Sequence, residues 1–201
     1  FYTKELTGYW FKGIQMAFQL LTDKDVSEFV KKYSPHLILN EGENMENNRW
    51  YKADIGNVCS DGSSDHIYLR KTDSPNLAFI FMGGGACWNT DTMKYPMGVS
   101  YQAKGLPGLY MPNSNEYCDL LVFLSGVEPG LLSEKKDNPF HDWNIALLTY
   151  TTADFNLGRN DIEYTDLEGN SKMFHFHGYH HFEESLRKAS EMLSCTGHLL
   201  I

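Results

Sequence analysis

Three consecutive glycines follow an apolar run in the middle of the chain, and they are the sharpest chemical feature of the sequence. Gly83, Gly84 and Gly85 come directly after Leu77–Met82 and are followed by Ala86–Asn89. Because glycine has no Cβ, such a loop lets backbone N–H groups approach a ligand closely. Placed after a strand, these groups can stabilise the negative oxygen that develops during acyl transfer. No GxGxxG or GxxxxGK[ST] pattern indicates a phosphate loop, and a plain glycine turn is the simpler alternative.

A second group of reactive side chains consists of four histidines within seven residues: His175, His177, His180 and His181. Metal binding is one hypothesis, because His177 and His181 have i, i+4 spacing and could share a helix face. HExxH is absent, and Glu183-Glu184 lie on the wrong side of the pair. The simpler interpretation is aromatic packing at a helix start, with the histidines capping the helix or exposed to solvent. We therefore expect no metal site and no cofactor.

The four cysteines are Cys59, Cys87, Cys118 and Cys195. No CxxC motif occurs, so zinc ribbons and thioredoxin-like redox sites are not indicated. Two disulfides and four free buried thiols fit the count equally well. Cys87 lies in the glycine-rich loop and could be a nucleophile, but a buried structural cysteine or half of a disulfide is the more typical role.

Residues near strand ends define an expected pocket. Asp154 follows the apolar run Ile145–Tyr150, and ligands of α/β sheets bind at the carboxyl ends of strands. We expect Asp154 to line a substrate pocket together with three residues of the glycine-rich loop, Gly83, Ala86 and Trp88. Asp61-Gly62, near Cys59, is typical of a turn between strands.

The elements that must position these residues indicate an α/β sheet. The continuous apolar runs Leu77–Met82 and Ile145–Tyr150 have strand length and suit strands that are buried on both faces, as in a parallel sheet. His66–Leu69 is a further candidate strand, and another begins at His198. A helix over about 178–193 separates the last two strands and has apolar residues at i, i+4, i+7 and i+11, namely Phe182, Leu186, Ala189 and Leu193. This order predicts a βαβ unit.

The N-terminal residues predict helices. One apolar stripe recurs at helical spacing through Tyr9, Trp10, Ile14, Phe18 and Leu21. A second short helix, with Val26, Phe29 and Val30, is expected to end before Ser34-Pro35. Packing against the core or a protein partner is the usual role of such a face, and a membrane surface is the alternative. Between the strands, residues 94–137 are irregular and rich in Pro and Gly, which is typical of a lid or an insertion.

Composition excludes several classes of protein. The chain has 201 residues, close to one domain, and its aromatic content of 14% is too high for a disordered chain. Its net charge of −9 argues against an extended nucleic-acid binder, which needs a basic face. No apolar run of 18 residues predicts a transmembrane helix, and no secretory signal is visible.

The order of four segments resembles the pectin acetylesterase and Notum family. Val58–Ser63 and Phe81–Asn89 are similar to the opening of that family. Asp137–Asn144 resembles its NP-F-x-x-W-N segment, and Tyr150–Gly158 resembles its Y-C-T-G-D-x-H-x-G segment. His177-Gly178 before an amphipathic helix is also similar. The resemblance covers residues 50–201, with an insertion near 113–127.

This resemblance implies an α/β-hydrolase fold: a mostly parallel sheet flanked by helices, here the N-terminal half of the domain over residues 50–201 and incomplete at its C-terminus, preceded by a helical extension over residues 1–49. It implies a serine carboxylesterase that removes acyl groups from a polysaccharide or a protein. Gly84 and Gly85 would supply oxyanion donors, and the Ser, acid and His of the triad are expected after Ile201. It also implies a secreted or lumenal location.

The chain departs from this family at two cysteine positions. Met93 and Thr151 stand where the family has Cys, so Cys59 and Cys87 lack their usual partners. They would pair instead with Cys118 and Cys195, or stay reduced. Two alternatives to an esterase remain: a non-catalytic relative that binds or scaffolds through its N-terminal helices, and a metal protein that uses the four histidines.

Overall fold

The structure is a computed structural model that describes residues 28, 32–33, 37–97, 104–113, 118–119, 122 and 130–201. The apolar residues that predict the two N-terminal helices lie outside these ranges, as does most of the insertion near 113–127. The helical extension over residues 1–49 therefore stays a prediction.

Five strands form the central sheet: β1 (Trp50–Val58), β2 (Ser64–Arg70), β3 (Leu77–Phe81), β4 (Asn144–Leu148) and β7 (Leu199–Leu200). Their order across the sheet is β1-β2-β4-β3-β7. β3 pairs in parallel with β4 on one side and with β7 on the other. β2 is antiparallel to both β1 and β4. The sheet is thus mixed, which corrects the prediction of a mostly parallel sheet.

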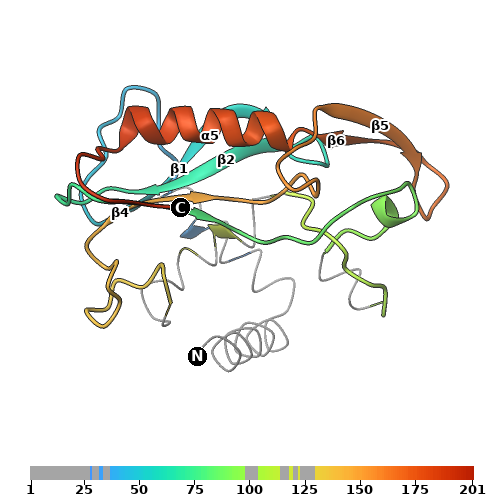
Figure 1. Cartoon of the computed structure of the whole chain (residues 1–201). Helices are drawn as coiled ribbons and strands as arrows, with labels where there is room; N and C mark the ends of the chain where they lie inside the picture. Colours follow the sequence, from blue (N-terminus) through green and yellow to red (C-terminus); the bar gives the residue numbers. More distant parts are fainter. Residues whose placement is uncertain are drawn as a thin grey trace.

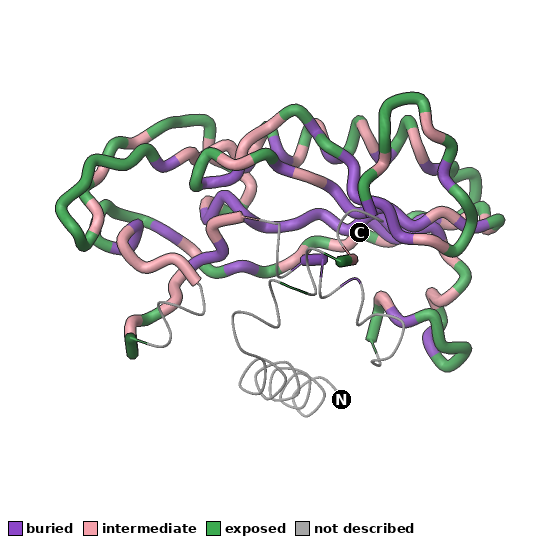
Figure 2. Tube along the Cα trace, turned by 180° about the vertical axis from the view of Figure 1, so that it is seen from behind, coloured by how far each residue is buried: buried purple, intermediate pink, exposed green. Residues whose placement is uncertain are grey.

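The central strands are apolar because both of their faces are covered. In β4, Ala146 and Leu148 belong to one buried cluster, whereas Ile145 and Leu147 belong to a second cluster on the other face. Successive side chains of a strand point to opposite faces, so a strand with two covered faces needs an uninterrupted apolar run. Figure 2 shows the buried residues concentrated along these strands.

Helix α5 (Gly178–Met192) covers one face of the sheet, where it packs against β1, β2 and β4 (Figure 1). Ala189 and Leu193 are buried in the cluster beneath the helix, and Phe182 packs against that cluster. Leu186 is 49% exposed, so it is the one predicted apolar position that stays outside the core.

A hairpin of β5 (Asn160–Thr165) and β6 (Ser171–Phe176) precedes α5 and extends to one side of the central sheet (Figure 1). Phe174 is buried with Cys87, Met93, Tyr110 and Ala153, which attaches the hairpin to the loops after β3 and β4. A short 3-10 helix, η2 (Thr92–Lys94), lies in the first of these loops. Within the described part of the chain, none of the helices has the length and apolar character needed to cross a bilayer.

Candidate functional site

Three of the segments singled out in the sequence meet at the carboxyl ends of β3 and β4. The N–H of Ser60, in the β1–β2 turn, donates to the carbonyl of Thr151 over 2.9 Å. The N–H of Cys87, after the glycines, donates to the carbonyl of Ala153 over 2.9 Å. These two bonds join residues that are far apart in sequence into one surface at the edge where α/β sheets bind ligands. We call this surface, made of residues 59–62, 83–89 and 150–158, the strand-end site.

Residues 109–111 pair with the glycine loop and hold its backbone in place. The N–H of Ala86 donates to Leu109 O over 3.0 Å, and the N–H of Met111 donates to Gly84 O over 2.7 Å, as in an antiparallel bridge. The N–H groups of Gly83, Gly84 and Gly85 donate no hydrogen bond to any part of the chain that the structure describes. Gly84 is nevertheless buried. Gly85 is exposed. An N–H group without a partner in the protein is available to an incoming acceptor.

Two of the three glycines are required by their surroundings. A Cβ on Gly84 would overlap the carbonyl oxygen of Tyr150. Gly85 has φ +84°, and a Cβ there would overlap the carbonyl of Leu109. Gly83 would have nothing within 4 Å of an added Cβ. The triplet is therefore more than a flexible turn, because Gly84 and Gly85 permit close backbone packing.

The loop after β4 is unusually bent. Ala153, Phe155 and Asn156 have φ of 56°, 58° and 59°, a region that residues with a Cβ rarely occupy. The hydroxyl of Tyr150 accepts a hydrogen bond from the N–H of Phe155 over 2.6 Å, which helps to hold this bend. Burial raises the pKa of the Tyr150 hydroxyl. Clusters of strained residues of this kind are common at functional sites.

Asp154 is anchored through both of its carboxylate oxygens. Its Oδ2 accepts hydrogen bonds from the N–H groups of Gly158 (3.1 Å) and Gly178 (2.9 Å). Its Oδ1 accepts from the N–H of Asn156 (3.0 Å) and the hydroxyl of Thr152 (2.7 Å). Both oxygens are occupied by the loop and by the first residue of α5. Asp154 therefore fastens the helix to the strand-end site, and its place in the lining of a substrate pocket stays a prediction.

Large apolar side chains stand on the rim of the strand-end site. Trp88 is 69% exposed, and Phe155 and Leu157 are 71% and 75% exposed. Trp88 follows Cys87, whose N–H is hydrogen-bonded to Ala153. The loops that carry these side chains therefore lie next to each other. Gly83 and Ala86, the other predicted pocket residues, belong to the same loop. A separate cavity of about 380 Å³ lies between α5 and the β3–β7 edge, and its lining includes none of the predicted pocket residues.

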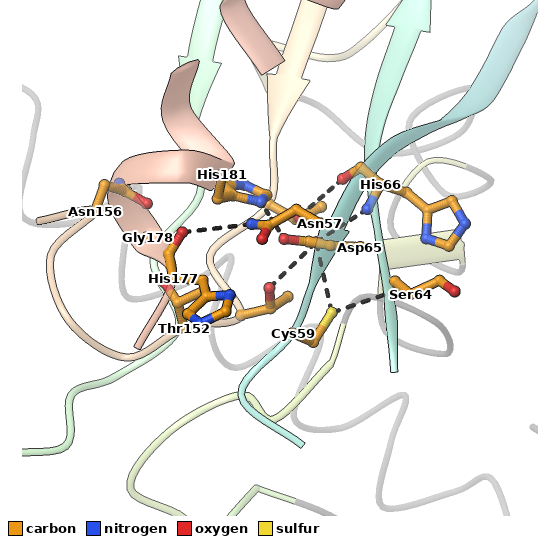
Figure 3. Close-up of polar contacts among 12 residues, drawn as sticks. Asn57, Cys59, Ser64, Asp65, His66, Thr152, Asn156, His177, Gly178 and His181 are labelled. Carbon is orange, nitrogen blue, oxygen red and sulfur yellow. Dashed lines mark hydrogen bonds and ion pairs between the residues drawn. The ribbon is translucent and has the colours of Figure 1, made fainter. Parts of the chain in front are cut away.

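A buried carboxylate that the sequence did not single out organises the base of this region. Asp65, on β2, forms a fully buried pair with Nδ1 of His181 on α5 (Figure 3). It also accepts hydrogen bonds from the Thr151 hydroxyl (3.3 Å) and from the Cys59 thiol (3.5 Å). Asp65 thus joins β2, α5 and the strand-end site. Nothing in the run Ser64–Arg70 distinguishes it from a solvent-facing strand position, since the burial comes from α5.

The four histidines do not converge on one point. His181 is buried against Asp65, and His180 is half exposed, with Nδ1 3.7 Å from Glu183 Oε2. His175 Nδ1 and His177 Nε2 instead approach the same oxygen of Asp161, at 2.7 and 2.9 Å. The hypothesis of a four-histidine metal site is therefore wrong as stated. Desolvation acts to raise the pKa of Asp161, but the hydrogen bonds and charges of His175 and His177 outweigh it and lower that pKa below 3.8.

All four cysteines are free, as in the alternative in which Cys59 and Cys87 stay reduced and do not pair with Cys118 and Cys195. Cys59, Cys87 and Cys118 are buried, and Cys195 is exposed. Burial raises the pKa of the Cys87 thiol, which disfavours the thiolate that a nucleophile needs. Cys59 and Thr151 share Asp65 as a hydrogen-bond partner, so a polar contact joins these two positions.

The segment Asp137–Asn144 lies at the opposite end of β4. The Asn144 side-chain carbonyl accepts from the N–H of Thr72 over 2.8 Å. Its amide donates to the carbonyls of Ser74, Asn76 and Ser194, at 2.8, 3.1 and 3.1 Å. This part of the family resemblance concerns residues that close the amino-terminal edge of the sheet, away from the strand-end site.

Comparisons with known proteins give a distant likeness in structure. No family profile and no curated protein sequence matches the chain. One crystal form of the Wnt deacylase Notum from Drosophila matches with a TM-score of 0.44 and 22% identity, over 69% of this chain and 37% of that one. A second crystal form matches with a TM-score of 0.48 and 19% identity, over 77% and 41%. The chain thus covers less than half of these Notum chains, and neither likeness is close enough to transfer a site or an activity.

Proposed function

We propose that this chain forms part of a carboxylic ester hydrolase, in which the N–H groups of Gly84 and Gly85 bind the oxyanion of an acyl-transfer reaction. The observation that carries the proposal is the pair of N–H groups without partners among the described residues, on a rigid loop at the carboxyl end of β3. Oxyanion donors must be in place before the reaction starts, because donors that have to reorganise give little stabilisation. The bridge between Gly85 and Tyr110 supplies that rigidity.

The chemistry is that of serine esterases. A serine hydroxyl attacks the acyl carbon, a histidine accepts its proton, and the carbonyl electron pair moves onto the oxygen that the two N–H groups bind. Collapse of this intermediate expels the alcohol, which takes the proton from the histidine, and water then releases the acid by the same steps. As part of the proposal, the nucleophile, acid and base follow Ile201, as the family resemblance implies.

The side chains on the rim of the strand-end site indicate the kind of substrate that it would bind. Trp88, Phe155 and Leu157 give the loops an exposed apolar surface, which suits an acyl group carried on a larger polysaccharide or protein. The net charge of −9 mildly disfavours a polyanionic polysaccharide. A secreted or lumenal location rests on the resemblance alone, and the four free thiols give it no added support.

Reaction of the full-length protein with a fluorophosphonate probe tests this function, together with hydrolysis of a short-chain nitrophenyl ester. We expect labelling at a single serine after Ile201 and measurable turnover. Gly85→Ala keeps the N–H group, but its Cβ would overlap the Leu109 carbonyl and must displace the loop. A displaced donor should reduce labelling per folded molecule by up to about 10²–10³-fold, the usual cost when one oxyanion donor no longer acts. Gly105→Ala is the matched control, because Gly105 also has a left-handed φ (+69°) but nothing within 4 Å of an added Cβ.

The outcomes separate the hypotheses. A folded wild-type protein that neither reacts with the probe nor hydrolyses esters would favour the non-catalytic binding protein. Equal losses of labelling in Gly85→Ala and Gly105→Ala, after correction for the folded fraction, would mean that the glycine loop serves the fold and not the oxyanion.

A further inference from the structure

We propose that Asp161, His175 and His177 bind a divalent transition-metal ion of the zinc class, at a site that adjoins the strand-end site but takes none of its ligands from it. Two imidazole nitrogens and one carboxylate oxygen are the donor set that zinc and its neighbours prefer, whereas magnesium and calcium prefer oxygen donors alone. The three ligand atoms all lie within 4.8 Å of one another.

The β5–β6 hairpin creates this convergence. Asp161 on β5 is the direct cross-strand partner of His175 on β6. Because side chains alternate along a strand, Phe174 and Phe176 turn toward the apolar cluster beneath the hairpin, and His175 and His177 face the other way. His177 is also the residue that precedes the first turn of α5. One face of the hairpin therefore carries the three ligands, and the other face anchors it.

The distances fit a site that needs little adjustment. His175 Nδ1 and His177 Nε2 lie 2.7 and 2.9 Å from the same Asp161 Oδ1, and the two rings are 5.5 Å apart. Bonds of about 2.0–2.1 Å in a tetrahedral zinc site separate neighbouring ligand atoms by about 3.3 Å. The two separations between histidine nitrogen and Asp161 oxygen therefore need to widen by only about half an ångström. The side chains of His175, His177 and Asp161 are 23%, 25% and 48% exposed. This leaves room for that shift and for water as the fourth ligand.

Neighbouring backbone holds the two histidines in place. The N–H of His175 donates to Ser60 O over 3.1 Å, and the side-chain amide of Asn57 donates to His177 O over 3.4 Å. His175 Nε2 lies 3.3 Å from the position of a Cβ on Gly62, so a larger residue there would press on the ring. Both ligands are thus tied to the end of β1 and the turn that follows it. Supporting contacts of this kind position metal ligands.

A bound ion would link three elements that are otherwise joined by hydrogen bonds and apolar contacts: β5 through Asp161, β6 through His175, and the start of α5 through His177. Metal binding to the folded chain alone would stabilise that junction. His180 does not belong to the site, since its ring centre is 6.3 Å from that of His177 and its Nδ1 faces Glu183.

Calorimetric titration of the metal-free full-length protein with Zn²⁺ tests the site, at about pH 7.5, where most imidazoles are neutral. We expect one ion per chain with micromolar or tighter affinity, a melting temperature that rises with Zn²⁺, and the visible spectrum of four-coordinate Co²⁺ when cobalt is used instead. His177→Ala and Asp161→Asn should each weaken binding by at least about 10–100-fold. His180→Ala, a histidine three residues away, should leave it unchanged.

Circular dichroism and melting of each metal-free variant show whether it is folded, so that loss of the fold is not mistaken for loss of a ligand. Two results would overturn the proposal: wild-type affinity weaker than about 1 mM, or equal losses in His180→Ala and His177→Ala. Either result can occur whether or not the protein is an esterase, because the titration does not depend on turnover.

Discussion

The backbone of Gly84 lies so close to Tyr150 that a Cβ on residue 84 would overlap the Tyr150 carbonyl oxygen. This contact brings the ends of β3 and β4 together at the point where Gly84 has an N–H without a partner among the described residues. The absence of a side chain at residue 84 therefore serves close packing, and the same packing fixes the direction of the N–H group.

Replacing Gly84 with alanine should destabilise the protein, whereas the same change at its neighbour should not. Gly84→Ala forces an atom into a filled space, which typically costs about 1–3 kcal/mol. Gly83→Ala adds its methyl where nothing lies within 4 Å and should stay within about 0.5 kcal/mol of wild type. Denaturant unfolding of the two variants checks this, and equal midpoints would contradict the packing described for residue 84.

Asp154→Asn should loosen the junction between the strand-end site and α5. The carboxylate accepts four hydrogen bonds, from Thr152, Asn156, Gly158 and Gly178, and an amide nitrogen cannot accept the bonds that one oxygen now receives. We expect a loss of about 2–3 kcal/mol in unfolding free energy, since bonds to a charged acceptor are strong. Asp137→Asn removes an exposed carboxylate as the control, and the assignment fails if both variants unfold alike.

His181→Ala should be strongly destabilising because it leaves the buried carboxylate of Asp65 without its partner on α5. Removing one partner of a buried pair typically costs about 3–5 kcal/mol. His180→Ala changes the adjacent, half-exposed histidine and should cost less than about 0.5 kcal/mol. Thermal unfolding of both variants decides the matter, and a His181→Ala protein as stable as wild type would show that the pair does not hold α5 to β2.

The thiols should react in the order set by their burial. Cys195 is exposed, and it should be alkylated first under native conditions. Cys118 and Cys87 should resist, because burial raises the pKa of both thiols and the thiolate is the reactive form. A raised pKa means that raising the pH toward 9 increases their reaction only slightly. Peptide mapping after iodoacetamide treatment measures this, and protection of two cysteine pairs that only a reductant relieves would instead indicate disulfides.

The strands that could be predicted from the sequence are those with a continuous apolar run. Leu77–Phe81 and Asn144–Leu148 are covered on both faces, so their residues carry the signal of a buried strand by themselves. β1 (Trp50–Val58) gave no such signal, because Lys52, Asp54 and Gly56 interrupt it and only tertiary packing buries its apolar face. β5 was missed for a similar reason, since its burial is slight along its whole length.

Some parts of the candidate sites could likewise be predicted from the sequence, and others could not. The glycine loop was predicted because glycine itself is the signal. The contacts of Asp65 with His181 and of Asp161 with His175 and His177 join residues from separate elements, so spacing along the chain could not reveal them. The prediction of a mostly parallel sheet was wrong because it extended the βαβ order of β4, α5 and β7 to the whole sheet. β2 is instead antiparallel to both of its neighbours, β1 and β4.

The structure of the full-length protein after reaction with a fluorophosphonate tests the proposed oxyanion site most directly. The phosphonyl oxygen of the adduct imitates the oxyanion of acyl transfer, so it reports where that charge would be bound. We expect this oxygen to lie about 2.7–3.1 Å from the backbone nitrogen of Gly84 or Gly85. An adduct whose oxygen is bound by other groups, with both glycine nitrogens beyond hydrogen-bond distance, would contradict the account.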